Sequence, residues 1–324
     1  MTQDPDDKVS GESDGRGPSG LGEEASPAAS GTPDENTPLT AEVSADVADM
    51  VEEFMDQNAQ QNEAAAEALP DVRNKPGAYI SFDHVFKSFG DFAVLEDVSF
   101  CVNPGETLCI LGRSGVGKSV ALQMLLGFLK PDQGTIRVAG EDICGYTERE
   151  MQAIRRKVTM VFQNGALFDS ISVGENVAFS MRERRELSEE QIQQVVKGLL
   201  EMVGVAGMEN LLPSDLSTGM KRSVAIARAL ASQPEAVLYD EPTTMVDPLM
   251  AHLLGNLIMR LKQQLHLTSI VVTHDMQFAT KLADRVVFLH QGKVQFFGTM
   301  EAMGQSKDPI IQEFLAMDEL LLPT

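Results

Sequence analysis

The chain has 324 residues, of which 43% are hydrophobic and 23% are charged, a length that predicts about two domains and a sizeable core. No run of 18 or more apolar residues occurs, which excludes an integral membrane protein. The formal net charge of −22 disfavours direct binding to nucleic acid or to anionic lipid. The three cysteines, Cys101, Cys109 and Cys144, lack C-x-x-C spacing. This argues against a disulfide framework and a structural zinc site, and favours a reducing, cytoplasmic compartment.

An acidic arm occupies residues 1–76, which hold 18 acidic residues against 4 basic ones, whereas the rest of the chain holds 30 against 22. Its first 40 residues are rich in Asp, Glu, Gly, Ser and Pro, a composition that predicts disorder. Apolar residues then recur at helical spacing over 41–56, after Thr40 as a candidate N-cap. Both a helix that docks on the folded part and a transient amphipathic helix in a solvated tail fit this pattern.

We expect one folded domain over residues 77–316, followed by a short tail, 317–324. Short apolar runs bounded by turn residues predict strands at 94–102, 106–111, 236–239, 269–273, 286–289 and 294–297. Helical spacing predicts a helix that begins at Lys118 and an inserted, mostly helical subdomain over about 147–215. The alternation of strands and helices predicts an α/β fold with a parallel sheet covered on both faces.

The first motif with chemical meaning matches the G-x-x-x-x-G-K-[ST] phosphate loop, placed after an apolar strand and before a helix. Its glycines let successive backbone N–H groups face phosphates, and the helix start adds its positive dipole end. Lys118 should reach the β and γ phosphates, and Ser119 should bind Mg²⁺. The residues of the loop are Gly112, Arg113, Ser114, Gly115, Val116, Gly117, Lys118 and Ser119.

A second motif is an apolar strand that ends in two acids, Asp240 and Glu241. Its position predicts that both carboxylates lie beside the phosphate loop. Asp240 should hold Mg²⁺, and Glu241 should polarise the attacking water as a general base. A GTPase should also carry an N-K-x-D motif after the phosphate loop, but the single Asn-Lys pair, Asn74-Lys75, lies upstream. GTP is therefore disfavoured as the nucleotide.

The stretch 216–220, Leu-Ser-Thr-Gly-Met, resembles the L-S-G-G-Q signature of ABC ATPases. Other family elements follow in the expected order: Gln163 in the Q-loop, His274 as the switch histidine, Asp247 in the D-loop and Phe89 where an aromatic ring stacks on adenine. The resemblance covers about residues 77–314. It implies a P-loop NTPase fold with a RecA-like core, an antiparallel β subdomain and an inserted helical subdomain.

The resemblance also implies a head-to-tail dimer, in which Ser217 and Gly219 of one copy close on the ATP held by the other copy. Thr218 replaces the first glycine of the signature, and a positive φ there would strain a β-branched residue. The implied catalytic residues are Glu241, His274, Lys118 and Gln163, and the implied Mg²⁺ ligands are Ser119, Gln163 and Asp240.

Three stretches, 162–170, 173–183 and 308–315, together with Met220, resemble the ATPases of Mla/Mce-type lipid transport systems. This resemblance implies a permease in the inner membrane, an Mce-domain lipid-binding protein beyond it, and a peripheral location at the cytoplasmic face. The alternatives are an ABC importer ATPase for another small solute and a non-transport ABC ATPase. The single phosphate loop and the compact helical insert favour a transporter, and no nucleic-acid partner is expected.

Overall fold

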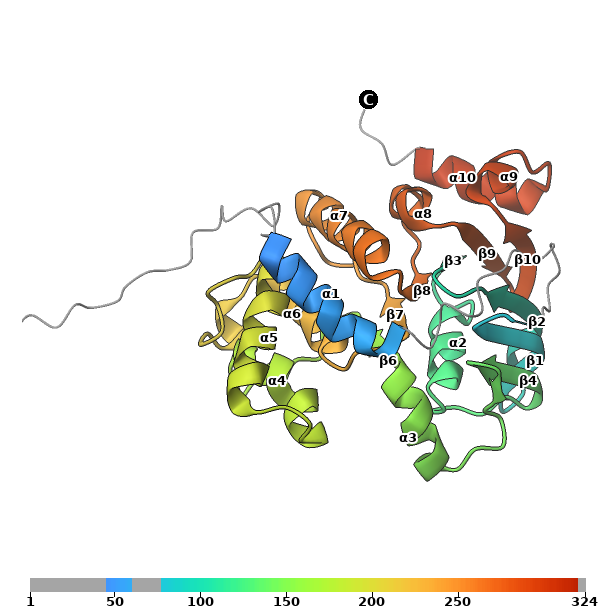
Figure 1. Ribbon diagram of the computed structural model, residues 1–324. Coiled ribbons are helices and arrows are strands. Elements are labelled where there is room, and N and C mark those ends of the chain that lie inside the picture. The colour runs from blue at the N-terminus through green and yellow to red at the C-terminus, as the bar shows by residue number, and fades with distance from the viewer. Residues whose placement is uncertain (1–44, 60–76, 320–324) are drawn as a thin grey trace, which may run out of the picture. The chain divides into compact units, whose positions relative to one another are not determined.

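The computed structural model describes residues 45–59 and 77–319 of the chain. The disorder predicted for residues 1–40 lies outside the described residues, as does the end of the predicted tail. Two sheets and their flanking helices make up the folded part (Figure 1).

A six-stranded sheet with the order β10-β9-β3-β8-β7-β6 forms the centre. All of its strand pairs are parallel except the antiparallel pair of β10 with β9 at one edge. The strands are β3 (Thr107–Leu111), β6 (Val158–Val161), β7 (Ala236–Asp240), β8 (Thr268–Val272), β9 (Arg285–His290) and β10 (Lys293–Gly298). Because β3 and β8 are buried along their whole length, their apolar residues occupy consecutive positions, 108–111 and 270–272, rather than alternating ones.

An antiparallel sheet of four strands, with the order β2-β1-β4-β5, lies on one side of the central sheet. Its strands are β1 (Ile80–Phe89), β2 (Phe92–Val102), β4 (Gln133–Val138) and β5 (Glu141–Asp142). The helices α2 (Lys118–Leu125) and α3 (Glu148–Lys157) share an apolar core with this sheet. Leu108 and Ile110 of β3 point into this core, while Cys109 and Leu111 point to the opposite side.

The opposite core is built mainly from helices. These are α1 (Ala45–Ala59), α4 (Val173–Arg184), α5 (Glu189–Met202), α6 (Thr218–Leu230), α7 (Pro248–Leu265), α8 (Met276–Leu282), α9 (Met300–Gly304) and α10 (Pro309–Glu319). The short η2 (Pro213–Asp215) lies between α5 and α6 in the chain. Thr147, Ser172 and Ser188 begin α3, α4 and α5 with capping boxes, which satisfy exposed N–H groups of the first turn. Within the described ranges, no helix combines the length and apolar character needed to cross a bilayer.

The α/β fold with a parallel central sheet is confirmed, and each predicted strand range overlaps an observed strand. The range 147–215 is not helical throughout. It contains β6, which pairs in parallel with β7, so its first part belongs to the central sheet. The helices that follow β6 and precede β7 form the helical subdomain, α4 to α6.

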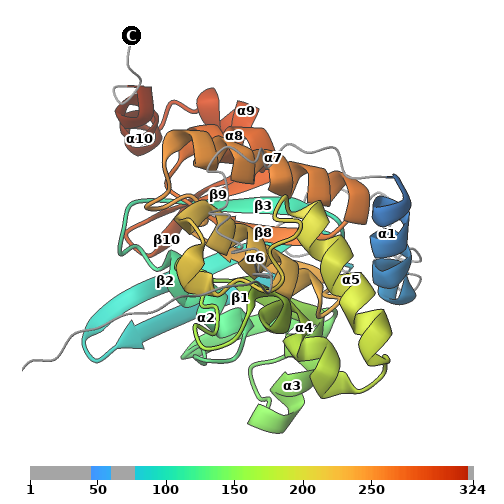
Figure 2. The same cartoon turned by 90° about the vertical axis from the view of Figure 1, so that its left-hand side faces the viewer.

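Helix α1 (Ala45–Ala59) overlaps most of the stretch predicted to be helical in the arm, and it packs against α5 and α7 (Figure 2). Val51 is fully buried in this contact and Phe54 nearly so. Gly198 of α5 permits the close approach, since a Cβ there would lie 2.3 Å from Met50 Cε. The side-chain amide of Gln233 donates to the carbonyl of Phe54. The structure therefore shows α1 as a docked helix.

Replacing Val51 with Asp should detach α1, because the change buries an unpaired carboxylate in place of an apolar side chain. The change should lower the free energy that holds α1 against α5 and α7 by about 3 kcal/mol and leave the stability of the central sheet unchanged. Hydrogen exchange followed by mass spectrometry should show loss of protection over residues 45–59. Glu52→Ala, at an exposed neighbouring position, is the control. Retained protection in the Val51 variant would contradict a docked α1.

Candidate active site

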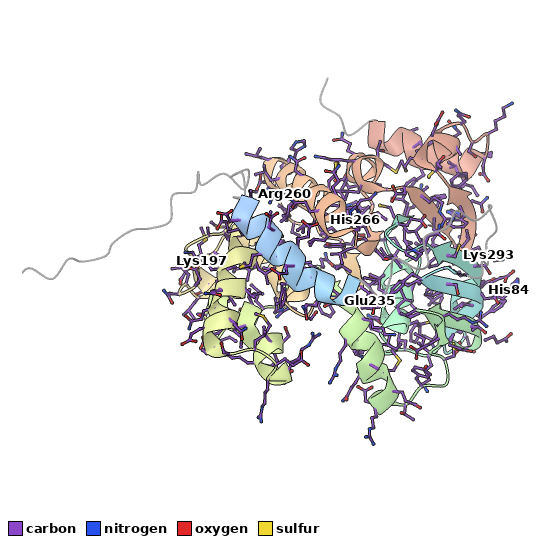
Figure 3. All side chains as sticks on the ribbon, viewed as in Figure 1. His84, Lys197, Glu235, Arg260, His266 and Lys293 are labelled. Carbon is purple, nitrogen blue, oxygen red and sulfur yellow. The ribbon has the colours of Figure 1, made fainter. Side chains whose placement is uncertain are left out.

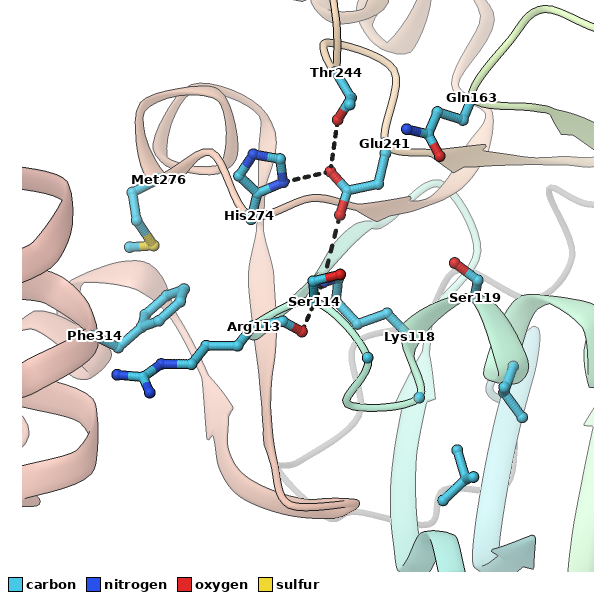
Figure 4. Close-up of a pocket in the computed structure, with 14 residues that line it drawn as sticks. Arg113, Ser114, Lys118, Ser119, Gln163, Glu241, Thr244, His274, Met276 and Phe314 are labelled. Atoms are coloured by element: carbon cyan, nitrogen blue, oxygen red, sulfur yellow. Dashed lines mark hydrogen bonds and ion pairs between the residues drawn. The ribbon is translucent and has the colours of Figure 1, made fainter. Parts of the chain in front are cut away.

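The candidate site lies where β3, β7 and β8 end, at one edge of the central sheet. The parallel register pairs Val272 of β8 with Ile110 of β3 and with Asp240 of β7, so the segments that follow these strands meet. They surround a pocket of about 630 Å³ (Figure 4). Its lining is Val94, Arg113, Ser114, Gly115, Gly117, Lys118, Ser119, Val120, Gln163, Glu241, Thr244, His274, Met276 and Phe314.

The loop between β3 and α2 has the backbone conformation that a phosphate cradle requires. Gly112 has φ +148°, and a Cβ there would lie 2.5 Å from the carbonyl oxygen of Leu289. Gly117 has φ +103° and caps α2 without a side-chain hydrogen bond. The N–H groups of the first turn of α2 are therefore not satisfied by a cap, and they carry the positive end of the helix dipole. This arrangement suits a phosphate group.

Lys118 places a cation in the pocket wall although its side chain is only 6% exposed. Its Nζ donates to the carbonyl oxygens of Gly112 (2.8 Å) and Arg113 (3.2 Å). The same nitrogen lies 3.4 Å from Oε1 of Glu241. These three oxygens compensate the buried charge, which would otherwise be costly to desolvate.

Glu241 is held at both of its carboxylate oxygens. Oε2 lies 2.7 Å from Nδ1 of His274 and accepts a hydrogen bond from Oγ1 of Thr244 at 3.1 Å. The residue has φ +48°, a conformation that costs energy for a non-glycine residue and persists only where its surroundings enforce it. Its N–H donates to the carbonyl of Val272, which anchors the backbone (2.9 Å). The carboxylate is thus fixed opposite the phosphate loop, where it can accept a proton.

Three oxygen-bearing residues, Ser119, Asp240 and Gln163, are suited to hold a divalent cation. Ser119 Oγ donates to Asp240 Oδ1 at 3.0 Å, and Gln163 lines the same pocket after the end of β6. Burial raises the pKa of Asp240, and the hydrogen bond from Ser119 opposes this shift. Because hydroxyl, amide and carboxylate oxygens are the ligands that Mg²⁺ prefers, this donor set fits that ion.

The signature residues expected to act in trans, and the D-loop residue Asp247, lie at the starts of two helices rather than in the pocket lining. Ser217 caps α6, and Asp247 caps α7 by accepting the N–H of Met250 at 2.9 Å. The two helix starts are in contact, since a Cβ on Gly219 would lie 2.2 Å from Met250 Cε. Thr218 is the first residue of α6 and does not have a positive φ, so the backbone strain considered for it does not occur.

The lining also differs from the predicted residues in its apolar part. Phe89 lies at the end of the β1–β2 hairpin, half exposed, and is not among the lining residues. Val94, Met276 and Phe314 line the pocket instead, with Thr244 as a further polar member. Sequence reasoning missed Met276, which begins α8 after β8, and Phe314 of α10, which follows the last strand, because neither apolar side chain belongs to a motif. Thr244 could have been found from the sequence, because its hydroxyl lies only three residues after Glu241.

Comparison with known proteins gives concordant matches. The profile described as "ABC transporter" matches residues 95–244. The intermembrane phospholipid transport system ATP-binding protein MlaF of Haemophilus influenzae is 42% identical over 226 residues, which cover 70% of this chain and 86% of that protein. Protein TRIGALACTOSYLDIACYLGLYCEROL 3 of Arabidopsis thaliana is 38% identical, covering 75% of each chain. A probable ribonucleotide transport ATP-binding protein of Mycobacterium leprae, mkl, is 36% identical, covering 76% of this chain and 71% of that one.

Solved structures agree with the sequence matches. The dimeric ATP-binding cassette MJ0796 bound to ADP and Pi superposes with a TM-score of 0.63 at 29% identity, covering 68% of this chain and 98% of that chain. The protein cbiO1 of Clostridium perfringens, part of the ABC transporter complex cbiONQ, gives 0.66 at 27% identity, covering 76% and 98%. Given these matches and the pocket that joins a phosphate loop to Glu241, the chain belongs to the family of ABC transporter ATP-binding subunits and is an ATPase.

Proposed function

We propose that this chain powers lipid transport through a separate permease by binding and hydrolysing ATP with Mg²⁺. The observation that carries the catalytic part is the position of Glu241, which His274 and Thr244 hold opposite Lys118 and the phosphate loop. The lipid cargo is supported by the MlaF relative, whose name specifies intermembrane phospholipid transport.

The described residues suggest a division of labour. The loop from Gly112 to Ser119 binds the phosphates through its backbone N–H groups, and Lys118 neutralises their charge. Glu241 accepts the proton of the water that attacks the γ phosphate in line, and His274 orients that carboxylate through the contact at Oε2. Magnesium, held by Ser119, Asp240 and Gln163, would supply charge neutralisation on the phosphate oxygens.

A second copy of the chain would complete the site. Met245 is 88% exposed and Leu249 is 68% exposed, and both lie beside the contacting starts of α6 and α7. Large apolar side chains exposed this strongly next to polar helix caps favour a protein interface. We infer that this surface faces a second copy, which brings Ser217 and Gly219 against the ATP of the first. The related cassette MJ0796 is a dimer in its complex with ADP and Pi, which supports this inference.

The helical subdomain offers a surface for the permease. Phe168 and Phe179 are 45% and 42% exposed, and their ring centroids lie 5.0 Å apart. Phe179 also lines a groove of about 520 Å³ with Ile171, Glu175, Arg182, Glu183 and Arg185. This apolar pair beside charged residues fits a protein partner. Such a permease would hold the chain peripherally at the cytoplasmic face of the inner membrane, and an Mce-domain lipid-binding protein would act beyond it.

Glu241→Gln should lower the ATPase kcat by about 10³-fold, because the amide cannot accept the proton of the attacking water. ATP affinity should stay within about threefold, since the phosphate loop is unchanged. Steady-state phosphate release and a fluorescent-nucleotide titration measure the two quantities. Glu301→Gln, at an exposed position in α9, is the control. Turnover that survives in the Glu241 variant would remove this residue from the role of base.

The double variant Met245→Glu/Leu249→Glu should weaken ATP-dependent dimerisation by at least about tenfold, because it places like charges on both sides of the interface. Sedimentation velocity of the Glu241→Gln protein, with and without the double change, measures the monomer–dimer equilibrium in the presence of ATP. Phe128→Glu, at a 54% exposed position elsewhere, is the matched control. An unchanged equilibrium would place the dimer interface elsewhere.

Phospholipid should copurify with the complex of this chain and its permease, because a transported lipid occupies the membrane partner. Mass spectrometry of the lipids retained after gentle solubilisation, compared with an unrelated permease purified in the same way, measures the enrichment. ATPase activity of the complex should also rise when that lipid is added back. Enrichment of a nucleotide or another solute in place of lipid would favour the alternative of a solute importer.

A further inference from the structure

Arg222 is a buried cation for which the proposed mechanism gives no role. It lies one turn into α6, five residues after the cap Ser217, and its exposure is 4%. No carboxylate pairs with it in the described part of the chain, and its Nε is buried without a hydrogen-bond partner. A charge buried in this way costs several kcal/mol. Stability alone therefore does not account for an arginine at this position.

The two hydrogen bonds that Arg222 does make join α6 to two segments that contribute residues to the pocket. Nη1 donates to the carbonyl oxygen of Phe162 and Nη2 to that of Thr244, each at 3.3 Å. Phe162 directly precedes Gln163, which lines the pocket. The hydroxyl of Thr244 donates to Oε2 of Glu241. One planar guanidinium thus contacts the segment that carries the Q-loop glutamine and the turn that holds the base.

Arg228 provides a comparison on the same helix. Its guanidinium donates to the carbonyl oxygens of Ala166 (2.7 Å) and Gly165 (3.1 Å) and lies over the ring of Phe168. These contacts also fasten α6 to the segment after β6, but they are made to residues beyond Gln163, and none of them reaches the turn after β7. The link to the turn that holds Glu241 is therefore a property of Arg222 and not of arginines on α6 in general.

We propose that Arg222 is a positioning residue for ATP hydrolysis. By donating hydrogen bonds to the carbonyls of Thr244 and Phe162, it fixes the positions of Glu241 and Gln163 relative to α6. The proposal rests on the proposed function, because it assumes that Glu241 is the base. Since Ser217 caps the same helix, a phosphate bound at the start of α6 and the base in the local pocket would be connected through one side chain.

The test uses the full chain with Arg222→Met, Arg222→Lys and the matched control Arg228→Met. Arg222→Met should lower kcat by about 30-fold while ATP affinity stays within about threefold, because the phosphate loop is untouched. Arg222→Lys should recover at least about threefold of that loss, since its ammonium can still donate to one carbonyl at a time. Arg228→Met should leave kcat within about threefold. Phosphate release, nucleotide titration and melting temperature are measured for each variant.

A double-mutant cycle with Arg222→Lys tests the proposal even if the methionine variant fails to fold. Thr244→Val removes the hydroxyl that contacts Glu241 but keeps the carbonyl that Arg222 contacts. Its effect on kcat should be less than additive with that of Arg222→Lys, because both act through the same carboxylate. Unchanged kcat in both Arg222 variants, equal losses in Arg222→Met and Arg228→Met, or additive effects in the cycle would overturn the proposal. A wild-type chain without ATPase activity would instead overturn the proposed function.

Discussion

The site depends on how a buried lysine is compensated. The Nζ of Lys118 donates hydrogen bonds to the carbonyls of Gly112 and Arg113, and Oε1 of Glu241 supplies an opposite charge 3.4 Å from that nitrogen. These groups can meet only because β3 and β7 both run parallel to β8 and end at the same edge of the sheet. A parallel register fixes which backbone positions are level, so it determines that the phosphate loop faces the acidic end of β7. The order and direction of the strands thus determine which catalytic groups can meet in the site.

Much of this arrangement could be predicted from the sequence, because short-range patterns determine it. The phosphate loop and the two acids at the end of β7 each lie at the end of an apolar run, and such runs are typical of strands buried on both faces of a parallel sheet. Strands without that signal were missed. β1 carries several register irregularities and β4 begins with exposed residues, so neither shows a regular pattern. β6 has only four residues and follows directly on α3, which hid it within a helical stretch.

Contacts between distant segments could not be predicted in the same way. Phe314 reaches the pocket because α10 packs its ring against Phe288 of β9, two elements far from the phosphate loop in sequence. Phe89 was assigned by its place in the family order; its ring lies at an exposed hairpin end beside Lys87, and its stacking on adenine stays a prediction. The substitution Thr218 raised concern because a positive φ would strain a β-branched residue, whereas Thr218 belongs to the first turn of α6 and has no positive φ. In each case the missing information was three-dimensional.

Several arginines link the helices of this acidic chain by donating to backbone carbonyls rather than to carboxylates. Arg184 of α4 donates to the carbonyl of Ser232, just after α6, and Arg260 of α7 (labelled in Figure 3) donates to that of Met202, the last residue of α5. A cation at the carbonyl end of a helix satisfies unpaired acceptors and interacts favourably with the dipole. Backbone carbonyls do not titrate, so these links persist where carboxylate pairs would be lost on acidification. Arg222 uses the same chemistry, but its acceptors lie in the two segments that carry Gln163 and Glu241. At Arg222, therefore, the same arginine-to-carbonyl hydrogen bonds that elsewhere join helices also position the residues proposed to act on ATP.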